Sequence, residues 1–478
     1  MSGPAGTADL VVASNRGPFS LVAEPDGSLR PRPAGGGLAP SLAAALSNTP
    51  GATWVTAALS EADRRGAAAG SIASGQAGLS LRLVALEPEV LAAAYDVVAN
   101  AVLWFVYHGL FDAPRRPVFD DEWLRAWEGF RLYNRAFADV VATVAADGGV
   151  ALVNDYHLPL VGAMLAADRP DLRTVHFSHT PFASVEELAM LPHAAARELL
   201  EGMAGFGACG FHSARWERAF RRCAAEAGSP QPETFVAPLG PDLARLQEVA
   251  ASPECSARRS SLQERLGGRQ LLLRNDRIEL SKNLLRGLRA FDLLLAERPQ
   301  WRGAVVHLVR AYASREALPE YLAYRSEVEH LAAVVNERWS KGGYEPVVVD
   351  VDDDFPSTVA ALGSYDVLLV NPVRDGMNLV AKEGPALNER DGMLVLSEQA
   401  GAYDELASEA FGVHAFDVSQ TSQAIHEALS LDGTARSERA SRLRALAVAH
   451  PPAEWLDRLL SHARRPAMAP PPAGRRGS

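Results

Sequence analysis

Residues 365–383, YDVLLVNPVRDGMNLVAKE, constrain the fold of this chain more than any other stretch. Residues 365–370 form a short apolar run, which is typical of a buried parallel strand. Asn371-Pro372 ends the run, the loop Arg374-Asp375-Gly376 follows, and a helix is predicted from Met377 onward. In an open α/β sheet, ligands bind beyond the carboxyl ends of the strands. The stretch therefore predicts a ligand site in a sheet of this kind.

The helix after this loop predicts a phosphate site beside sugar-binding groups. A helix start offers unpaired backbone N–H groups and the positive end of the helix dipole, which suit a phosphate. Asp375 and Glu383 would repel a diphosphate, but their carboxylates accept hydrogen bonds from sugar hydroxyls. The alternative, in which Asp375 only caps the helix, accounts for a lone aspartate but not for the whole string. The stretch is therefore interpreted as a nucleotide-sugar site.

The rest of the chain alternates strand and helix patterns over more residues than one core accommodates. A length of 478 residues predicts two or three domains. Buried strands are predicted at 10–13, 53–57, 151–153 and 271–273, and polar residues follow the ends of several strands. The fold class expected from this pattern is α/β, with ligand-binding groups at the strand ends.

Composition and charge exclude several classes of function. A net charge of −11 argues against nucleic-acid binding. No uninterrupted apolar run reaches the roughly 20 residues that a membrane helix needs, and the N-terminus lacks the pattern of a signal peptide. The sparse cysteines, Cys209, Cys223 and Cys255, predict reduced thiols and a cytoplasmic protein. The absence of CxxC and HExxH patterns predicts no metal site.

The string RDGMNLVAKE matches, letter for letter, the donor-binding segment of the trehalose-6-phosphate synthases. The chain resembles this family from about Val11 to Trp455. These enzymes are retaining glycosyltransferases of the GT-B class. The resemblance implies two facing Rossmann-like domains, in which helices flank parallel sheets.

The same resemblance implies where the domains begin and end. Residues 1–240 are expected to form the acceptor domain and residues 241–444 the nucleotide-sugar donor domain. A polar stretch up to Arg269 is interpreted as the link between them, and a helix at 445–463 is expected to pack back on the first domain. Residues 464–478 are rich in Pro, Ala and Arg and are predicted to be disordered.

Arg277 and Lys282 are the first candidate catalytic residues. They lie between a predicted strand and a helix predicted from Lys282, with Ser281 as its expected N-cap. Two cations at such a place are suited to a diphosphate, whereas the alternative is a pair of solvated surface cations. The resemblance implies that both residues neutralise the leaving phosphate, which is electrostatic stabilisation of developing charge.

His179 and Asp375 complete the catalytic set that the resemblance implies. His179 stands in HTPF and is expected to face the donor sugar, although Thr180 replaces the isoleucine common in the family. A lone histidine after a strand is otherwise more often structural. Asp375 would orient the donor glucose.

Residues for the acceptor are also implied by the resemblance. Asp155 in NDYHL would contact the acceptor sugar, although the preceding residue is Asn154 where the family usually has histidine. The remaining acceptor-binding residues match the family's phosphate-binding arginines and its aromatic pair: Arg16, Arg315, Tyr95 and Trp104. The alternative for the two aromatic residues is core packing.

The implied mechanism is same-face attack with retention and requires neither a metal nor a cofactor. The diphosphate would be held by backbone amides at Gly36, Gly37, Asn378, Leu379 and Val380. The acceptor hydroxyl would lose its proton to the departing phosphate, and Glu383 would accept hydrogen bonds from the ribose. Double displacement would instead need a carboxylate nucleophile near the anomeric carbon.

The leading hypothesis is transfer of glucose from a nucleotide-glucose to glucose 6-phosphate, which gives α,α-trehalose 6-phosphate. GDP-glucose is the favoured donor and UDP-glucose the other. The preference for GDP-glucose rests on an acidic run at 350–354 and the string NERD at 388–391. A carboxylate near the base can accept both N–H groups on the edge of guanine. The alternatives are a pseudoglycosyltransferase of the validoxylamine-phosphate synthase type and a catalytically silent regulatory homologue. The sequence leaves open whether the chain forms a homo-oligomer.

Overall fold

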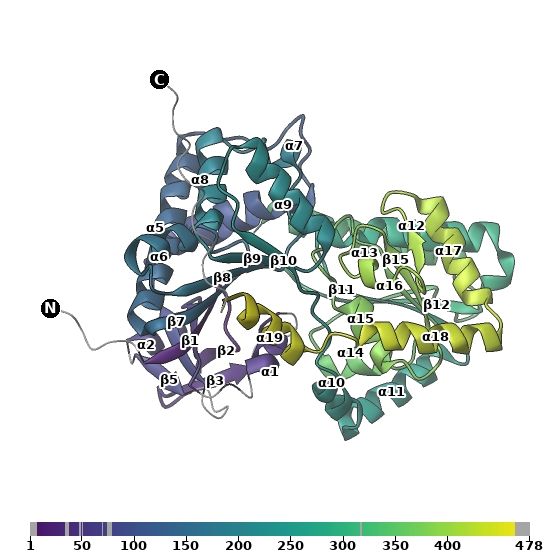
Figure 1. The fold of residues 1–478 in the computed structure, drawn as a ribbon. Helices are drawn as coiled ribbons and strands as arrows, with labels where there is room; N and C mark the ends of the chain where they lie inside the picture. The colour runs from purple at the N-terminus through teal and green to yellow at the C-terminus, as the bar shows by residue number, and fades with distance from the viewer. Residues whose placement is uncertain are drawn as a thin grey trace.

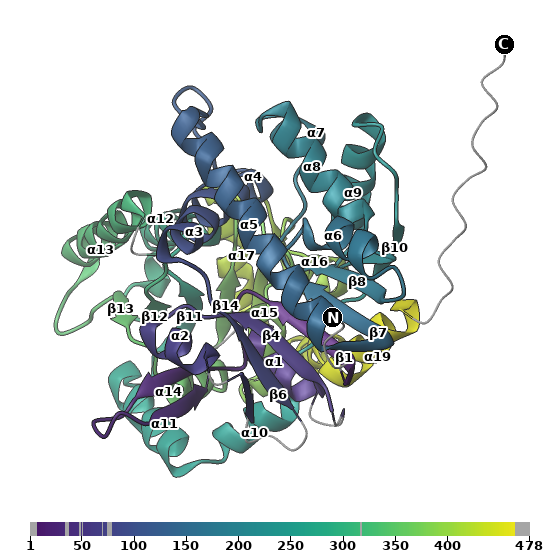
Figure 2. The same cartoon turned by 90° about the vertical axis from the view of Figure 1, so that its left-hand side faces the viewer.

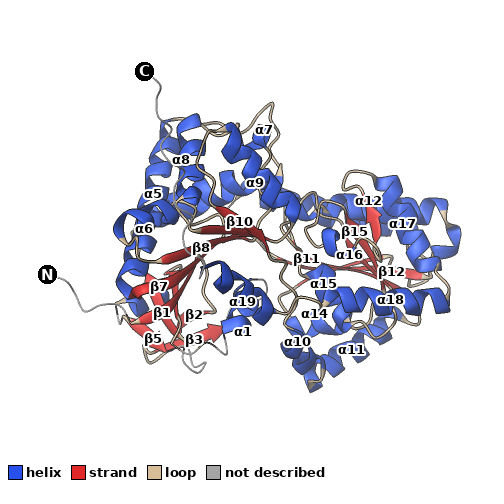
Figure 3. Cartoon of the chain, viewed as in Figure 1, coloured by secondary structure: helices blue, strands red, loops and turns tan. Residues whose placement is uncertain are grey.

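The computed structural model of the chain describes residues 7–33, 38–46, 49, 51–68, 70–73, 79–315 and 318–463. Gly36 and Gly37, and the predicted disordered tail at 464–478, lie outside these ranges. Figure 1 shows two sheets side by side, and Figure 3 shows the strands of each between layers of helices. The predicted α/β fold with parallel sheets flanked by helices is confirmed.

The first sheet has the strand order β10-β9-β8-β7-β1-β4-β6-β5 and is parallel except for β5, which pairs antiparallel with β6. Its strands are β1 (Ala8–Ser14), β4 (Thr53–Ala57), β5 (Ser71–Ala73), β6 (Ser80–Val84), β7 (Ala145–Asn154), β8 (Arg173–Ser178), β9 (Ala208–Phe211) and β10 (Glu233–Val236). A hairpin of β2 (Phe19–Ala23) and β3 (Leu29–Pro33) follows β1.

Helices cover both faces of the first sheet. The helical elements of this part are α1 (Leu38–Leu46), α2 (Glu61–Ala67), α3 (Pro88–Ala92), η1 (Ala93–Leu103), α4 (Trp104–His108), α5 (Asp121–Val144), α6 (Val161–Asp168), α7 (Val185–Leu188), α8 (His193–Ala204) and α9 (Ala214–Glu226). The aromatic stripe of α5 packs into one core together with η1, α4, α6 and α8. On the other face, α1 and the β2–β3 hairpin pack against the same strands.

The second sheet has the order β13-β12-β11-β14-β15-β16, with every pairing parallel. Its strands are β11 (Gln270–Arg277), β12 (Val305–Tyr312), β13 (Val347–Val351), β14 (Val367–Val370), β15 (Met393–Ser397) and β16 (Phe411–Val413). This is the doubly wound Rossmann order, in which the direction of winding reverses between β11 and β14. Both faces of the sheet are covered, which explains why β14 is apolar at every position.

The helices of the second part divide between the two faces of its sheet. They are α10 (Leu243–Ala250), α11 (Pro253–Leu266), η2 (Leu280–Lys282), α12 (Leu284–Glu297), η3 (Pro299–Trp301), α13 (Pro319–Trp339), α14 (Phe355–Leu362), α15 (Val380–Leu387), α16 (Tyr403–Leu406), α17 (Val418–Ser430) and α18 (Gly433–Ala447). One core contains α12, α13 and α17, and the other contains α11, α14 and α15. The polar stretch up to Arg269 was expected to link the two domains. This prediction is wrong, because α10 and α11 occupy most of the stretch.

The last helix, α19 (Pro452–Ala463), packs on the first sheet. Figures 1 and 2 show it in yellow against the first sheet, where it packs on β7, β8 and β9, and Trp455 is buried against Phe177 with ring centroids 5.0 Å apart. The expected single helix at 445–463 is wrong, because α18 ends at Ala447 and α19 begins at Pro452. Proline at positions 451 and 452 cannot donate the helical hydrogen bonds that would join the two.

One helical stretch of the first part is not regular α-helix throughout. Residues 88–108 form a continuous helical segment whose middle, η1, has π-helical hydrogen bonds. Among the described residues this is the one helix long and apolar enough to span a membrane. It is a core helix, since α5 packs along it and Trp104–His108 are buried.

Candidate functional site

The candidate site lies where the winding of each sheet reverses. In the first sheet this place is between β1 and β7, and Arg16 and Asp155 follow those strands. In the second sheet it is between β11 and β14, where Arg277 ends β11 and Asp375 follows β14. Ligands of doubly wound sheets bind at such points. Both sheets therefore place polar groups from the ends of their strands at the candidate site.

The loop after β14 of the second sheet and the loop after β8 of the first sheet approach each other through their backbones. A Cβ at Gly376 would lie 1.9 Å from the carbonyl oxygen of His179, so only glycine fits at this place. The Trp216 indole Nε1 donates to the Gly376 carbonyl at 3.0 Å. The loop after β14 is thereby joined to the loop after β8, which carries HTPF.

Asp375 is held by an ion pair with Lys282. Lys282 Nζ lies 2.6 Å from Asp375 Oδ2, and Asn378 Nδ2 donates to the same oxygen at 3.1 Å. Burial opposes the charge of Lys282, but Asp375 and Asp276 raise the lysine pKa above its ordinary value. Burial likewise opposes ionisation of Asp375, yet Lys282 holds the pKa of that carboxyl below its ordinary value. Both side chains are therefore charged.

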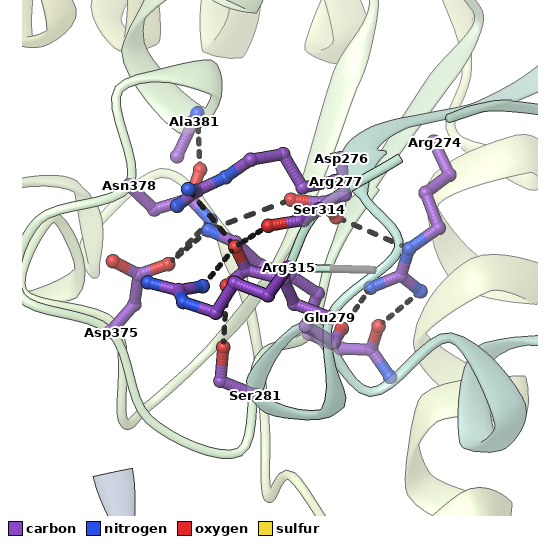
Figure 4. A network of polar contacts seen from close by, with 12 residues as sticks. Arg274, Asp276, Arg277, Glu279, Ser281, Ser314, Arg315, Asp375, Asn378 and Ala381 are labelled. Atoms are coloured by element: carbon purple, nitrogen blue, oxygen red, sulfur yellow. Dashed lines mark hydrogen bonds and ion pairs between the residues drawn. The ribbon is translucent and has the colours of Figure 1, made fainter. Parts of the chain in front are cut away.

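Glu279 connects Arg277 to Arg315 (Figure 4). Glu279 Oε1 lies 2.9 Å from Arg277 Nη1 and 2.6 Å from Arg315 Nη1, and it accepts from Ser314 Oγ at 2.8 Å. Its side chain is 0% exposed. Burial opposes the negative charge, but the two arginines lower the Glu279 pKa to about 2. Glu279 was not among the site residues expected from the sequence, although it lies between the two predicted catalytic cations, Arg277 and Lys282.

Arg315 also reaches into the first domain. It donates to Asn100 Oδ1 at 3.0 Å and to the Tyr156 hydroxyl at 3.3 Å, and its guanidinium lies 3.8 Å from the centre of the Trp104 ring. Arg315 has a φ of 46°, in the left-handed region. Trp104 is buried, so its ring both packs in the core and contacts the Arg315 guanidinium.

Arg16 lies beside Tyr95 on the first domain. Arg16 Nη2 donates to the Tyr95 hydroxyl at 3.0 Å in an exposed position. The Tyr95 ring stacks on His157, which in turn packs against Tyr156. Arg16 and Arg315 thus each hold the hydroxyl of one of two tyrosines that flank the same histidine.

Asp155 and His179 are brought together by the loops after β7 and β8. Asp155, with a φ of 71°, accepts at Oδ1 from the backbone N–H groups of His179 and Thr180, both at 3.2 Å. Burial raises the Asp155 pKa to about 6, although these amides oppose the rise. The aspartate is therefore fixed in place by its hydrogen bonds.

Both ring nitrogens of His179 have partners. Nε2 lies 3.1 Å from Asn154 Oδ1, and Nδ1 lies 3.1 Å from His212 Nε2. Asn154 Nδ2 donates to the Ala13 carbonyl, which leaves its oxygen for His179 and assigns the imidazole proton to Nε2. Burial and the neighbouring His212 hold the pKa of His179 well below its ordinary value, so the ring is neutral. Asn154, in the position usually occupied by histidine, acts as this acceptor.

The predicted helix starts need two corrections. Ser281 is not the cap of a helix that begins at Lys282, because Lys282 lies in η2 and Asn283, at a φ of 64°, precedes α12. The helix expected from Met377 begins at Val380, because Asn378 has a φ of 71°, outside the helical region. Asn378 and Leu379 therefore precede α15.

The backbone N–H groups of Asn378, Leu379 and Val380 donate to no backbone oxygen of a described residue, as expected before the first turn of a helix. Glu383, in that turn, accepts no hydrogen bond from the described residues, and burial raises its pKa to about 7. Gly36 and Gly37, the other residues expected at the diphosphate, lie outside the described residues.

Nothing in the described part of the chain forms a cluster of three or more His, Cys, Asp or Glu side chains able to hold a metal ion. The cations of the site are instead side chains of Arg and Lys. These can bind phosphate oxygens directly.

Comparison with known proteins gives consistent matches over nearly the whole chain. The model of "Glycosyltransferase family 20" matches residues 8–465. The chain is 33% identical over 477 residues to a trehalose-6-phosphate synthase of Mycobacterium ulcerans, covering 94% of this chain and 92% of that protein. It is 30% identical to a bifunctional trehalose-6-phosphate synthase/phosphatase of Thermoproteus tenax, covering 91% of this chain but only 60% of the length of that protein.

Solved structures also match over nearly the whole chain. An E. coli structure described as trehalose-6-phosphate bound with UDP-2-fluoro glucose superposes with a TM-score of 0.83 at 26% identity, covering 96% of this chain and all of that one. A UDP-forming α,α-trehalose-phosphate synthase from Burkholderia xenovorans, solved with glucose-6-phosphate, gives 0.83 at 25% identity, covering 95% of this chain and all of that one. These matches support the GT-B arrangement of the two sheets.

Proposed function

Because the chain belongs to glycosyltransferase family 20, we propose that it transfers glucose from a nucleotide-glucose to glucose 6-phosphate and forms α,α-trehalose 6-phosphate. The observation that carries the proposal is the pairing of two cation sets with sugar-binding carboxylates. Arg277 and Lys282 stand at the second sheet beside Asp375, while Arg16 and Arg315 flank the acceptor side near Asp155. Relatives named as synthases of this product match over nearly the whole chain.

The reaction that this arrangement supports is same-face attack. The bond from the anomeric carbon of glucose to the phosphate oxygen breaks, and the anomeric hydroxyl oxygen of the acceptor forms the new bond. Its proton passes to the leaving phosphate. Arg277 and Lys282 stabilise the charge that develops on that phosphate. Asp375, fixed by Lys282, orients the donor glucose.

The other residues bind and orient the substrates. Neutral His179, fixed by Asn154 and His212, borders the donor sugar. Glu383 accepts from the ribose hydroxyls, and the N–H groups before α15 hold the diphosphate. Asp155 accepts from the acceptor sugar. Arg16 and Arg315, with Tyr95 and Trp104, bind the acceptor phosphate by charge-assisted hydrogen bonds and an aromatic wall.

Three of the four aspartates in the acidic run at 350–354 pair with arginines. Asp350 pairs with Arg265, Asp352 with Arg310, and Asp354 caps α14 while pairing with Arg258. The guanine argument therefore rests on exposed Asp353.

The NERD string does not add to the guanine argument. Asn388 donates to the Tyr365 carbonyl, while Glu389 pairs with Arg259 and Arg390 with Asp366. GDP-glucose remains our sequence-based prediction, while UDP-glucose is supported by relatives described as UDP-forming.

The test is incubation of the purified chain with each nucleotide-glucose and glucose 6-phosphate. Nucleoside diphosphate release is followed, and the product is identified by NMR. We expect an α,α-linked disaccharide phosphate that requires both substrates. No transfer from any nucleotide-glucose would overturn the proposal, and transfer only from a cyclitol nucleotide would favour the pseudoglycosyltransferase. The ratio of kcat/KM for GDP-glucose and UDP-glucose, in the parent and in Asp353→Asn, decides the base.

A further inference from the structure

Glu279 is a buried charge in the site for which the proposed mechanism has no role. Three donors converge on its Oε1, from Arg277, Arg315 and Ser314, at 2.9, 2.6 and 2.8 Å. Its other oxygen, Oε2, is 3.5 Å from Ser281 Oγ. A carboxylate with no exposed surface and with cations on one oxygen is not placed to attack a sugar. Its contacts are those of a residue that positions others.

The two arginines on Glu279 come from different strands and serve different ligands in the proposed function. Arg277 ends β11 beside the donor phosphate, whereas Arg315 follows β12 and extends to Asn100 and Tyr156 of the first domain. Without the carboxylate, two guanidinium groups this close would repel each other. Burial opposes the negative charge of Glu279, but attraction to the two arginines outweighs this effect and holds the Glu279 pKa below its ordinary value.

We propose that Glu279 is a positioning residue that fixes the spacing of Arg277 and Arg315, and so couples binding of the nucleotide to binding of the phosphorylated acceptor. This inference rests on the proposed function. A diphosphate that binds Arg277 shifts the Glu279 carboxylate, which Arg277 shares with Arg315. This shift changes how firmly Arg315 is held for the acceptor phosphate. Because coupling between ligands is reciprocal, the acceptor must tighten nucleotide binding by the same factor.

The test measures binding without turnover. Isothermal titration gives Kd for UDP or GDP, whichever binds the parent more tightly, and for glucose 6-phosphate, each alone and with the other saturating. In the parent we expect each ligand to tighten the other by about tenfold. In Glu279→Gln, the amide can accept from one arginine but presents N–H groups to the other. We expect the coupling factor to fall to about one, while each ligand alone binds within a few-fold of the parent.

Two further variants make the result specific. Glu279→Asp keeps the charge on a shorter side chain and should restore part of the coupling, which a merely structural role would not require. Asp366→Asn is the matched control: this buried carboxylate accepts from Leu271 N at 2.7 Å and from Arg390, just before β14, and its loss should leave the coupling unchanged. Thermal unfolding checks that each variant folds, and if Glu279→Gln does not, the aspartate variant carries the test.

The outcomes are separable from those of the proposed function. Full parent coupling in the glutamine variant overturns the inference. Where only the aspartate variant folds, we expect coupling below the parent value, and full parent coupling there overturns the inference as well. So does a parent with no coupling. A parent that makes no trehalose phosphate overturns the proposed function instead, whatever the coupling measured.

Discussion

Arg277 and Lys282 are the side chains whose removal should slow the proposed reaction most. Arg277→Ala and Lys282→Ala each remove a cation at the leaving phosphate, and losing one such donor typically lowers kcat by about 100-fold or more. KM for glucose 6-phosphate should change far less. Steady-state kinetics with both substrates varied measures this. The exposed residues Arg338 and Lys341 supply matched alanine controls, and near-parental kcat in either site variant would contradict the assignment.

Arg16 and Arg315 should instead determine how well the enzyme recognises a phosphorylated acceptor. Arginine binds phosphate oxygens through a planar fork that lysine does not reproduce. We expect Arg16→Ala and Arg315→Ala to raise KM for glucose 6-phosphate, and to reduce its advantage over glucose in kcat/KM by at least about tenfold. Arg16 gives the cleaner test, because within the described part of the chain its guanidinium donates a hydrogen bond to Tyr95 alone. Unchanged preference for the phosphorylated sugar would remove both from the acceptor site.

Glu383 should make the stability of the free protein depend on pH. Burial raises its pKa from 4.5 to about 7 in the folded chain. Between these values the unfolded chain loses the proton while the folded chain keeps it, so the stability contributed by Glu383 falls as pH rises from about 4.5 to 7. Relative to Glu383→Gln, the parent should lose on the order of 2–3 kcal/mol between pH 4.5 and 8. Chemical denaturation across this range measures it, and a pH-independent difference between parent and variant would contradict the expectation. Exposed Glu226→Gln on α9 is the control.

The sequence alone predicted which single residues stand at the strand ends, but not how they pair. Asp375, Lys282 and Asp155 all lie where strand ends were expected to place them. The ion pair of Lys282 with Asp375 joins residues 93 positions apart. The link between Arg277 and Arg315 through Glu279 likewise depends on the register of β11 against β12. No local pattern contains that information.

At the level of elements, strands were predictable because parallel strands buried on both faces are continuous apolar runs. β4 has the predicted bounds, Thr53–Ala57. α11 was not predicted as a helix, because its sequence PECSARRSSLQERL is polar along most of its length and buries only Cys255 and Leu266. Without an apolar stripe, periodicity gives no signal. The π-helical η1 was missed because local sequence does not distinguish it from an α-helix.

The loop between β14 and α15 depends on Gly376. A Cβ there would lie 1.9 Å from the His179 carbonyl, which cannot move without displacing the HTPF loop. Gly376→Ala should destabilise the fold by on the order of 1–3 kcal/mol and lower kcat/KM, because His179 and Asp375 separate. Gly433→Ala, where a Cβ meets nothing within 4 Å, is the control and should behave as the parent. Thermal unfolding and initial rates measure both, and parental behaviour of Gly376→Ala would show that this close approach is not required.

In the whole molecule, the chain passes from one sheet to the other twice, and the two crossings meet. The first follows β10 through Leu239 and Gly240, and the second joins α18 to α19 through His450. A Cβ at Gly240 would lie 2.2 Å from the His450 carbonyl oxygen. Lys382 Nζ donates to the Leu239 carbonyl at 3.1 Å and pairs with Glu405 at 2.7 Å, and Glu405 lies 3.6 Å from His450. One buried lysine of the second domain, Lys382, therefore contacts the first crossing directly and the second through Glu405.

Lys382 should accordingly affect both stability and the relation of the two domains. Its side chain is 0% exposed, so Lys382→Met leaves Glu405 without its main partner, and breaking such a buried pair costs about 3–5 kcal/mol. The double variant Lys382→Met with Glu405→Leu removes both charges and should recover most of that loss. Its kcat/KM should stay several-fold below the parent, because the Leu239 carbonyl still lacks its donor and the first crossing is no longer tied to α15. Denaturation and steady-state rates, with exposed Lys341→Met as control, separate the two effects. Full recovery of activity in the double variant would mean that the pair stabilises the fold without positioning the domains.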